Sequence, residues 1–600
     1  MTSSETIDRE GRKTWSGRFD FLMTLVGSSV GTANLWRFPY LCYKNGGGVF
    51  LIPYFIALLG IGIPIFLLQV ALGQFMSLTG PNAWNIYPLA KGLGFITMVM
   101  TAYLALYYVV VIAWAIYYIY AAVANSPMPW TVCDESYGSK CYDRSLIAKN
   151  VSSLDSSMKE PAELFWTKGA LNLSESMESI GTIQPHMALS LLVAWIIVYL
   201  CIIRGIRWTG KIVWFTGLFP YVMLLVLFIR GVTLPGASKG IMYYLQPDFS
   251  KLLEGQVWLD AGTQIMYSMS LGEGNIITLA SYNHFHVNSL RDAIIFSAVN
   301  CLTSFFGGFC IFATLGYMAH ERDIPISEVS DGGPGLTFIA YPTALSLIPY
   351  GAKVFTVCFF LMILILGMDS QFVFLEGLSC QILDTFPRHF NFRFARAILI
   401  SCLCTLFYCI GLIFTTNAGM YYFQIFDFYS VSGAALLFLC FGQCFTIAYL
   451  YGGRRFLNDV ESMFPLGIVR PYLMVSWYIA TPILCVAIAI LYWATYKPLT
   501  YGQYTYPGWS VALGCLLAVP TIFAVPLAGI LELFKHRNQI GQVKIAVLKK
   551  HQIHHKSEQP YSIAQAEVHH KESSNMSEKM HQDYMMSTDE NPAVEMVSKC

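Results

Sequence analysis

Long apolar segments, separated by short polar ones, run along the chain from about residue 21 to residue 534. A helix needs about 20 apolar residues to cross the hydrocarbon core of a bilayer, and by that measure the pattern predicts about twelve spans. The segments are apolar throughout rather than alternating, which excludes the strands of a membrane barrel. The predicted spans cover 21–46, 49–77, 95–124, 187–203, 212–231, 259–282, 291–318, 352–383, 395–414, 419–452, 472–494 and 509–534. The predicted fold class is an all-α membrane protein.

Two of these spans are interrupted by glycines and polar residues. The first contains GSSVGTANLWRFPYL (27–41), and the sixth contains DAGTQIMYSMSLGEGNIITLASYN (260–283). Each opens a set of five spans, and broken helices in corresponding positions are typical of inverted-repeat (5+5) transporters with a binding site near the bilayer midplane. The backbone groups freed by the breaks need ions, ligand, water or neighbouring side chains as partners. A kink that serves only helix packing is the alternative.

The eighth span carries Asp369 and Ser370 within the apolar run LILGMDSQF. An ionised carboxylate at the centre of a span costs about 2.5–3.5 kcal/mol, so a cationic partner is expected. Carboxylate, hydroxyl and carbonyl oxygens suit a hard cation such as sodium. A protonated Asp369, or one bonded to a neighbouring helix, is the alternative.

Composition agrees with membrane burial and excludes two other classes of protein. Only 12% of the 600 residues are charged, whereas soluble domains use about a quarter. A net charge of +1 gives no argument for nucleic-acid binding. No nucleophile–base motif occurs in the polar segments, so we do not expect an enzyme. The membrane lipid is an expected partner.

Basic residues in the short loops predict the orientation of the chain. The loops after the fourth, eighth and tenth spans are basic, which places them in the cytoplasm together with the N-terminus. These residues are Arg204, Arg207, Lys211, Arg388, Arg393, Arg396, Arg454 and Arg455. The predicted organisation is a cytoplasmic segment 1–20, a transporter core 21–534 and a disordered cytoplasmic tail 535–600.

The loop 125–186 then lies outside the cell. It carries Cys133 and Cys141, and acceptor sequons for glycans at Asn150 and Asn172. A disulfide and glycans both require the oxidising, lumenal side, so two further signals agree with this orientation. We expect a multi-pass protein of the plasma membrane with both termini in the cytoplasm.

Several stretches between Arg12 and about Leu533 resemble the neurotransmitter:sodium symporter family. They are NLWRFPYLCYKNGGG (34–48), QIMYS, SYNHF, GPGLTFIAYP, LGMDSQF and YKPLTYGQYTYP, in the order of the family. YLCYKNGGG and DSQF most resemble the branch that carries GABA, betaine, taurine, creatine and glycine. The resemblance implies sodium- and chloride-dependent import of a small carboxylate-bearing amine by alternating access, with Na⁺ and Cl⁻ co-transported and no other cofactor.

The resemblance also implies ion sites. The first sodium site would use Ser29, Asn34, Ser268 and Asn300, and the second would use carbonyls of Gly27, Val30 and Leu366 with the side chains of Asp369 and Ser370. The chloride site would use Tyr54, Gln264, Ser268, Asn300 and Ser304. Chloride-independent relatives carry an acid at the position of Ser304, so the neutral serine implies a mobile anion.

The resemblance also implies which residues bind the substrate and which form the gates. The substrate residues would be Ser29, Gly31, Thr32, Ala33, Leu104, Tyr108, Tyr267, Ser268, Ser270, Glu273, Ser370 and Phe374. Arg37 and Asp427 match the outer charged pair, with Tyr108 and Tyr267 as the aromatic lid. The inner latch would be Arg12, Trp15 and Asp384.

Three departures from the family pattern concern the substrate. Gly31-Thr32-Ala33 replaces the usual Gly-Leu-Gly, Gln69 replaces a usual acid, and Glu273 replaces an uncharged residue. Monoamine carriers have aspartate at the position of Gly31, so the glycine favours a substrate that brings its own carboxylate. Glu273 is expected either to meet a cationic group of the substrate or to bond freed backbone amides.

Two alternative functions stay open at this point. One is a carrier of cationic or neutral nutrient amino acids. The other is a transporter-fold protein with a channel-like or regulatory role, against which the intact ion ligands argue.

Overall fold

The structure is a computed structural model, and it describes the following residues of the chain. They are 14–15, 17–31, 33–134, 141, 159–203, 206–322, 326, 336–346, 348, 350–431, 433–496, 498–501 and 504–535. Arg12, Thr32, Asn150 and the predicted tail 535–600, apart from its first residue, lie outside this description. The chain divides into two units, Met1–Glu532 and Leu533–Cys600, and the following account concerns the first.

The described residues are predominantly helical. The helices are α1 (Arg18–Ser29), α2 (Phe38–Lys44), α3 (Leu51–Ala57), α4 (Ile63–Met76), α5 (Gly80–Ala83), α6 (Lys91–Ala124), α8 (Pro161–Leu164), α9 (Pro185–Ile202), α10 (Ile206–Val232), α11 (Ala237–Leu245), α12 (Gly255–Ser268), α13 (Asn275–Ala280), α14 (Ser289–Arg322), α15 (Tyr341–Ser346), α16 (Ala352–Thr385), α17 (Ala395–Gly411), α18 (Gly419–Tyr429), α19 (Ala434–Phe445), α20 (Gly453–Met463), α21 (Val469–Val475), α22 (Thr481–Ala494) and α23 (Gly508–Lys535). Two short strands, β1 (Thr500–Tyr501) and β2 (Tyr504–Thr505), pair antiparallel.

Ten segments of the described chain are long and apolar enough to cross a membrane. They are Gly47–Met76, Pro88–Ala124, Pro185–Ile202, Phe215–Val232, Ser289–His320, Ala352–Thr385, Ala395–Thr415, Gly419–Met463, Val469–Ala494 and Gly508–Lys535. The first and sixth predicted spans are absent from this set because each is divided into two short helices, α1 with α2 and α12 with α13. These ten apolar segments and the two broken spans confirm the predicted multi-pass helical fold.

Backbone conformation explains both breaks. After α1 ends at Ser29, a π-helical segment, Ala33–Arg37, leads into α2, where Pro39 occupies the first turn and needs no hydrogen bond for its missing N–H. Between α12 and α13, Gly272 and Gly274 have φ values of 85° and 82°. A residue with a side chain is strained in this left-handed region, so the two glycines permit the break of the sixth span.

The tenth predicted span, 419–452, ends where a helical segment of the structure ends. The π-helical segment Thr446–Gly452 follows α19, and Gly452, with a φ of 104°, separates this segment from α20. Arg454 and Arg455 lie in the first turn of α20 and not in a loop.

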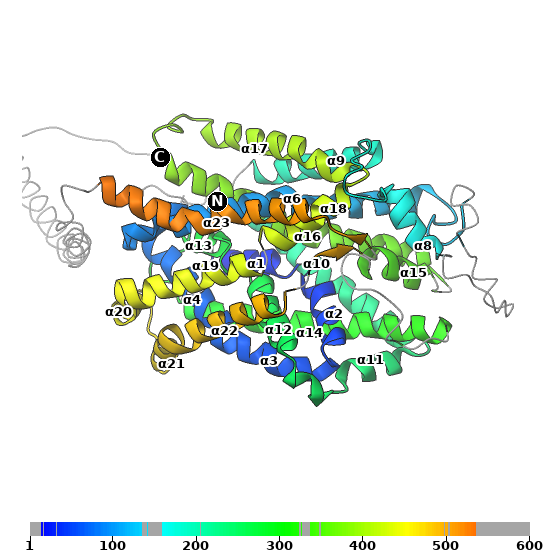
Figure 1. The fold of residues 1–600 in the computed structure, drawn as a ribbon, viewed down its shortest axis with the longest axis horizontal. Coiled ribbons are helices and arrows are strands. Elements are labelled where there is room, and N and C mark those ends of the chain that lie inside the picture. The colour runs from blue at the N-terminus through cyan, green and yellow to red at the C-terminus, as the bar shows by residue number, and fades with distance from the viewer. Residues whose placement is uncertain are drawn as a thin grey trace, which may run out of the picture. The chain divides into compact units, whose positions relative to one another are not determined.

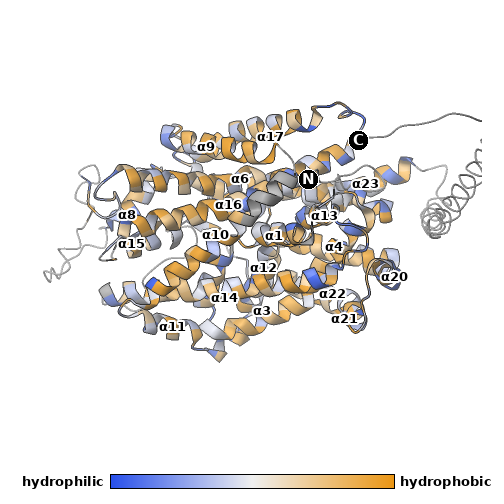
Figure 2. Ribbon diagram, turned by 180° about the vertical axis from the view of Figure 1, so that it is seen from behind, coloured by the Kyte–Doolittle hydropathy of each residue, from blue (hydrophilic) through white to orange (hydrophobic). Residues whose placement is uncertain are grey.

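The broken helices lie among the interior helices of this unit. Figures 1 and 2 both show α1 and α12 between α6 and α16 on one side and α3 on the other. In the most apolar 18-residue stretch of a helix, 72% of the stretch is buried for α6 and for α16, but only 11% for α23. Orange, apolar residues cover the outer helices in Figure 2, which is the surface expected to meet lipid tails.

Cys133 and Cys141, which lie in the long predicted outer loop, form a disulfide. This pairing confirms the predicted bond. Asn172, one of the two predicted glycan acceptors, is exposed, and its backbone φ is 44°.

Candidate functional site

The four residues predicted for the first sodium site lie together where α1, α12 and α14 meet. Asn34 donates from Nδ2 to Asn300 Oδ1 at 2.7 Å, and Asn300 donates from Nδ2 to Ser268 Oγ at 3.2 Å. Asn34 Oδ1 and Ser29 Oγ are buried and have no hydrogen-bond partner among the described residues. Buried polar atoms are normally satisfied, so two orphaned oxygens here fit a site for a hard cation.

The Ser29 carbonyl, also predicted to bind the first sodium, already accepts a hydrogen bond from the Gly31 N–H at 3.0 Å. A carbonyl oxygen has two lone pairs, so one of them remains for an ion.

The second predicted site lies where α16 packs against α1. Both carboxylate oxygens of Asp369 are buried without a hydrogen bond of normal geometry from the described residues, although the Thr216 hydroxyl lies beside them. Ser370 donates from Oγ to the Ser28 carbonyl at 2.9 Å, which joins α16 to the end of α1. The predicted carbonyl ligands come from the same two helices and the cap of α1; they are Gly27, Val30 and Leu366. A carboxylate among carbonyl and hydroxyl oxygens fits a sodium ion.

The residues predicted to hold chloride line the same region. Tyr54, Gln264, Ser268, Asn300 and Ser304 are all buried, with no more than 1% of any of them exposed. Ser304 Oγ accepts a hydrogen bond from Asn34 Nδ2 at 2.9 Å, so one asparagine touches both predicted ion sites. The Tyr54 hydroxyl contacts Cys301 Sγ at 3.5 Å. This cluster carries no side-chain charge of its own.

Gly31 brings the first break close to two hydroxyl groups. A Cβ at this position would lie 3.3 Å from both Ser370 Oγ and the Tyr108 hydroxyl. The Tyr108 ring meets Phe374 edge-on, with ring centroids 5.6 Å apart. The structure therefore brings together four of the predicted substrate residues. Leu104 is buried one turn away on α6, whereas nothing is described for the side chains of Thr32 and Ala33.

The second break contributes Ser270 and Glu273, both buried. The Glu273 carboxylate accepts a hydrogen bond from Asn275 Nδ2 at 3.3 Å, and its backbone carbonyl accepts one from the Thr101 hydroxyl at 2.6 Å. Thr101 and Asn275 were not predicted as site residues, because a threonine in an apolar helix gives no distinctive sequence signal.

The predicted outer gate residues have different partners from those expected. The Arg37 guanidinium lies over the Tyr267 ring, 4.9 Å from its centroid, and Asp427 accepts a hydrogen bond from the Tyr107 hydroxyl at 3.2 Å. Within the described part of the chain, no ion pair joins Arg37 to Asp427. Their role as a gate stays a prediction.

Trp15, predicted to belong to the inner latch, binds the end of the sixth span. Its backbone N–H donates to the Tyr282 carbonyl at 3.1 Å, and its ring N–H donates to the Leu279 carbonyl at 3.0 Å. Asp384 accepts hydrogen bonds from the Thr79 hydroxyl at 2.6 Å and from the Thr79 N–H at 3.1 Å. The latch function of these residues also stays a prediction.

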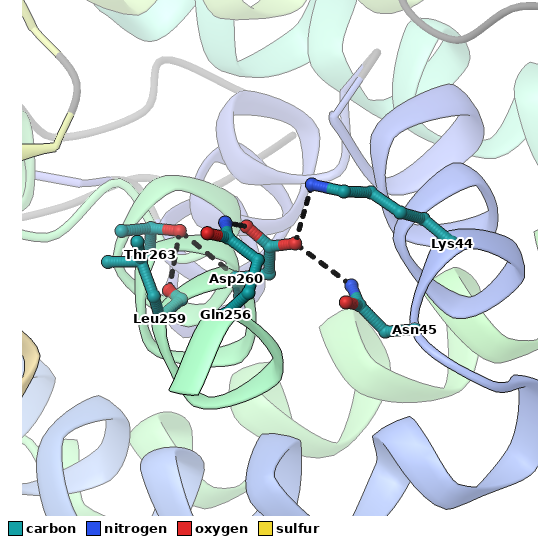
Figure 3. Close-up of polar contacts among 6 residues, drawn as sticks. All are labelled: Lys44, Asn45, Gln256, Leu259, Asp260 and Thr263. Carbon is teal, nitrogen blue, oxygen red and sulfur yellow. Dashed lines mark hydrogen bonds and ion pairs between the residues drawn. The ribbon is translucent and has the colours of Figure 1, made fainter. Parts of the chain in front are cut away.

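A further polar cluster joins the end of α2 to α12, one half of each broken span (Figure 3). Asp260 on α12 accepts hydrogen bonds from Lys44 at 3.1 Å, from Asn45 at 3.0 Å and from Gln256 at 2.8 Å. This cluster is not among the predicted sites, although Lys44 and Asn45 lie within a recognised motif, because Asp260 is 216 residues away from Lys44.

Comparisons with known proteins agree with this architecture. Residues 12–536 match the model of the Sodium:neurotransmitter symporter family. The chain is 45% identical over 528 residues to the human sodium- and chloride-dependent creatine transporter 1, covering 86% of this chain and 82% of that protein. It is 42% identical over 528 residues to the human sodium- and chloride-dependent taurine transporter, covering 87% of this chain and 85% of that protein. The creatine transporter of Torpedo marmorata is 45% identical over 539 residues, 88% of this chain and 87% of that protein. The chain therefore belongs to the sodium:neurotransmitter symporter family.

Proposed function

We propose that this protein is a plasma-membrane symporter that uses sodium and chloride gradients to import a small amine bearing an acidic group. The observation that carries the proposal is the set of orphaned buried oxygens around the break of the first span, on Ser29, Asn34 and Asp369. These oxygens come from the first and eighth spans and receive no hydrogen bond of normal geometry from the described residues. A bound cation satisfies such an arrangement.

The ions and the substrate would share the break between α1 and α2. The first sodium would lie beside the backbone at Gly31, where an acidic group of the substrate would complete its ligands. Chloride beside Ser304 would balance the added positive charge, because the surrounding side chains are neutral. Relatives whose names state creatine or taurine as their cargo favour a small zwitterion.

Uptake measurements test the proposal. Cells that express the chain should accumulate at least one of labelled creatine, taurine, GABA, betaine or amino acids, and replacement of Na⁺ by choline or of Cl⁻ by gluconate should abolish this uptake. The variant Asp369→Ala tests the second sodium site. It should remove uptake at an equal amount of surface protein, because the second sodium loses its carboxylate.

Two results would contradict the proposal. Saturable uptake that persists without sodium would exclude coupling, and a sodium current with no accumulation of any of these compounds would favour a channel-like role.

A further inference from the structure

The second span, Gly47–Met76, has a gap in its backbone hydrogen bonds near its middle. A π-helical segment, Leu58–Gly62, separates α3 from α4, and Pro64 lies in the first turn of α4. A proline has no N–H, so it cannot donate to the carbonyl four residues earlier, as in an α-helix, or five residues earlier, as in a π-helix. These two carbonyls belong to Gly60 and Leu59.

The eleventh span, Val469–Ala494, supplies the missing donors. The Tyr472 hydroxyl donates to the Leu59 carbonyl at 2.6 Å, and the Thr481 hydroxyl donates to the Gly60 carbonyl at 2.6 Å. Tyr472 belongs to α21 and Thr481 to α22, on either side of a π-helical segment at 476–480. Both carbonyls that Pro64 cannot serve therefore have a hydroxyl partner from one neighbouring span.

The centre of this contact is dry and closely packed. Trp477 and Thr481 are fully buried, and the Trp477 ring N–H donates to the Pro64 carbonyl at 3.0 Å. A Cβ at Gly60 would overlap Leu484 Cδ1, so the glycine lets α22 approach the second span. Because no water is available inside a membrane, backbone groups that lose their ladder partner depend on such side chains.

The gap in the second span lies beside the break of the sixth span. On one side of the gap α3 packs against α12, and on the other side α4 packs against α13. A Cβ at Gly62 would lie 3.0 Å from Ile265 Cγ2 and 3.0 Å from Met269 Sδ, at the end of α12. Each half of the second span is thus attached to a different half of the sixth span.

We propose that residues 58–64 are a hinge between α3 and α4, and that the eleventh span is a clamp that holds this hinge through Tyr472, Trp477 and Thr481. Bends in helices occur at prolines and at π-helical turns, and hinges are short segments that absorb changes of backbone dihedral angle. This inference rests on the proposed function, because it takes the two halves of the sixth span to move relative to each other during transport.

A double-mutant cycle tests the clamp. In Thr481→Val, hydrogen–deuterium exchange of the amides of residues 59–66 in the purified protein should be about tenfold faster, because loss of one buried hydrogen bond shifts a local opening equilibrium by roughly that factor. Pro64→Ala restores an N–H that can bond to the Gly60 carbonyl. In that background Thr481→Val should therefore change the exchange little.

Two control variants separate the hydrogen bond from packing. Thr481→Ser keeps the hydroxyl and should show the exchange of the unmodified protein. Thr521→Val removes a hydroxyl that is equally buried but bonds within its own helix, to the Ala518 carbonyl at 2.6 Å. It should leave exchange at residues 59–66 unchanged.

Movement of the hinge is tested by exchange in sodium and in choline, and by uptake. In the unmodified protein, exchange at residues 59–66 should differ between the two ions, and Pro64→Ala should reduce this difference. The same variant should lower the Vmax of uptake per molecule at the surface more than it changes KM, because a continuous helix resists bending. Surface biotinylation gives the number of molecules.

Each result decides one part of the proposal. An equal effect of Thr481→Val in both backgrounds, or equal exchange in Thr481→Val and Thr481→Ser, would overturn the clamp. The second comparison decides the clamp if Pro64→Ala does not fold. Exchange that is the same in sodium and choline in the unmodified protein, or full Vmax in Pro64→Ala, would overturn the hinge while sodium-coupled uptake stands. Absence of any sodium-dependent uptake would overturn the proposed function itself.

Discussion

At the scale of single residues, Gly31 and Ser304 lie beside the proposed substrate and chloride sites. At Gly31 the missing Cβ allows the Tyr108 and Ser370 hydroxyls to approach the backbone closely, each 3.3 Å from where a Cβ would lie. At Ser304 a neutral hydroxyl receives the hydrogen bond from Asn34, in a cluster without charge. Each position can be changed by one substitution whose effect follows from its neighbours.

Gly31→Ala should weaken substrate binding. The added methyl group would lie 3.3 Å from two hydroxyl oxygens, which is tighter than an ordinary contact, so the neighbours must move into the space for substrate. We expect the KM of uptake to rise several-fold, with surface expression unchanged. Gly307→Ala is the matched control, because its Cβ would meet nothing closer than 3.5 Å. An equal effect of both substitutions would contradict a pocket at Gly31.

Ser304→Glu should make uptake largely independent of chloride but still dependent on sodium. A carboxylate at this position would supply in fixed form the negative charge that chloride brings to the neutral cluster. Uptake in chloride and gluconate buffers measures the effect, and Ser304→Ala should not become independent of chloride. If Ser304→Glu reaches the surface and keeps its full chloride dependence, chloride binds elsewhere.

At the scale of elements, the end of α2 and α12, one half of each broken span, are joined into one unit. Lys44 and Asn45, at the end of α2, both donate to the same oxygen of Asp260 on α12. The Lys44 side chain is 41% exposed, whereas Asn45 is 2% exposed. The two donors should therefore differ in their contribution to stability.

Asn45→Ala should destabilise the protein more than Lys44→Ala. A buried hydrogen bond to a charged group contributes about 1.5–3 kcal/mol, whereas an ion pair to an exposed lysine contributes about 0–1 kcal/mol. The measurement is the thermal midpoint at which the detergent-solubilised protein loses its monodisperse chromatographic peak. A larger loss for Lys44→Ala would show that the ion pair, and not the buried amide, holds the two helices together.

At the scale of the whole molecule, the orientation in the membrane is a prediction. The disulfide offers a way to test it. Cys133 and Cys141 are bonded in the long loop between α6 and α9. We expect this loop outside the cell, with the N- and C-termini inside, because the basic residues lie in the loops of the opposite side.

An impermeant thiol reagent on intact cells should label Cys133 and Cys141 only after reduction. Epitope tags at either terminus should become accessible only after permeabilisation. Removal of Asn150 and Asn172 together, by substitution with glutamine, should lower the apparent mass as much as glycosidase treatment does. Tags that react on intact cells would reverse the orientation.

Much of the fold could be predicted from local patterns. The number of spans follows from the length of the apolar runs, and the break of the sixth span follows from Gly272 and Gly274, which permit left-handed backbone. The disulfide followed from two cysteines in one polar loop. The separate helix α20 could not be predicted, because its charged first turn, with Arg454 and Arg455, resembles a loop in hydropathy.

The sequence by itself determined which residues are chemically able to bind ions, through a motif order shared with a family. Only the tertiary structure decided which of their atoms lack partners. Ser29 Oγ and the Asp369 carboxylate receive no hydrogen bond of normal geometry from the described residues, whereas Lys44 and Asn45 bond to Asp260, and Gln69 bonds to Gln443, 374 residues away. The physical reason is that hydropathy and backbone propensity belong to neighbouring residues. Whether a buried charge is paired depends on which distant segments pack beside it.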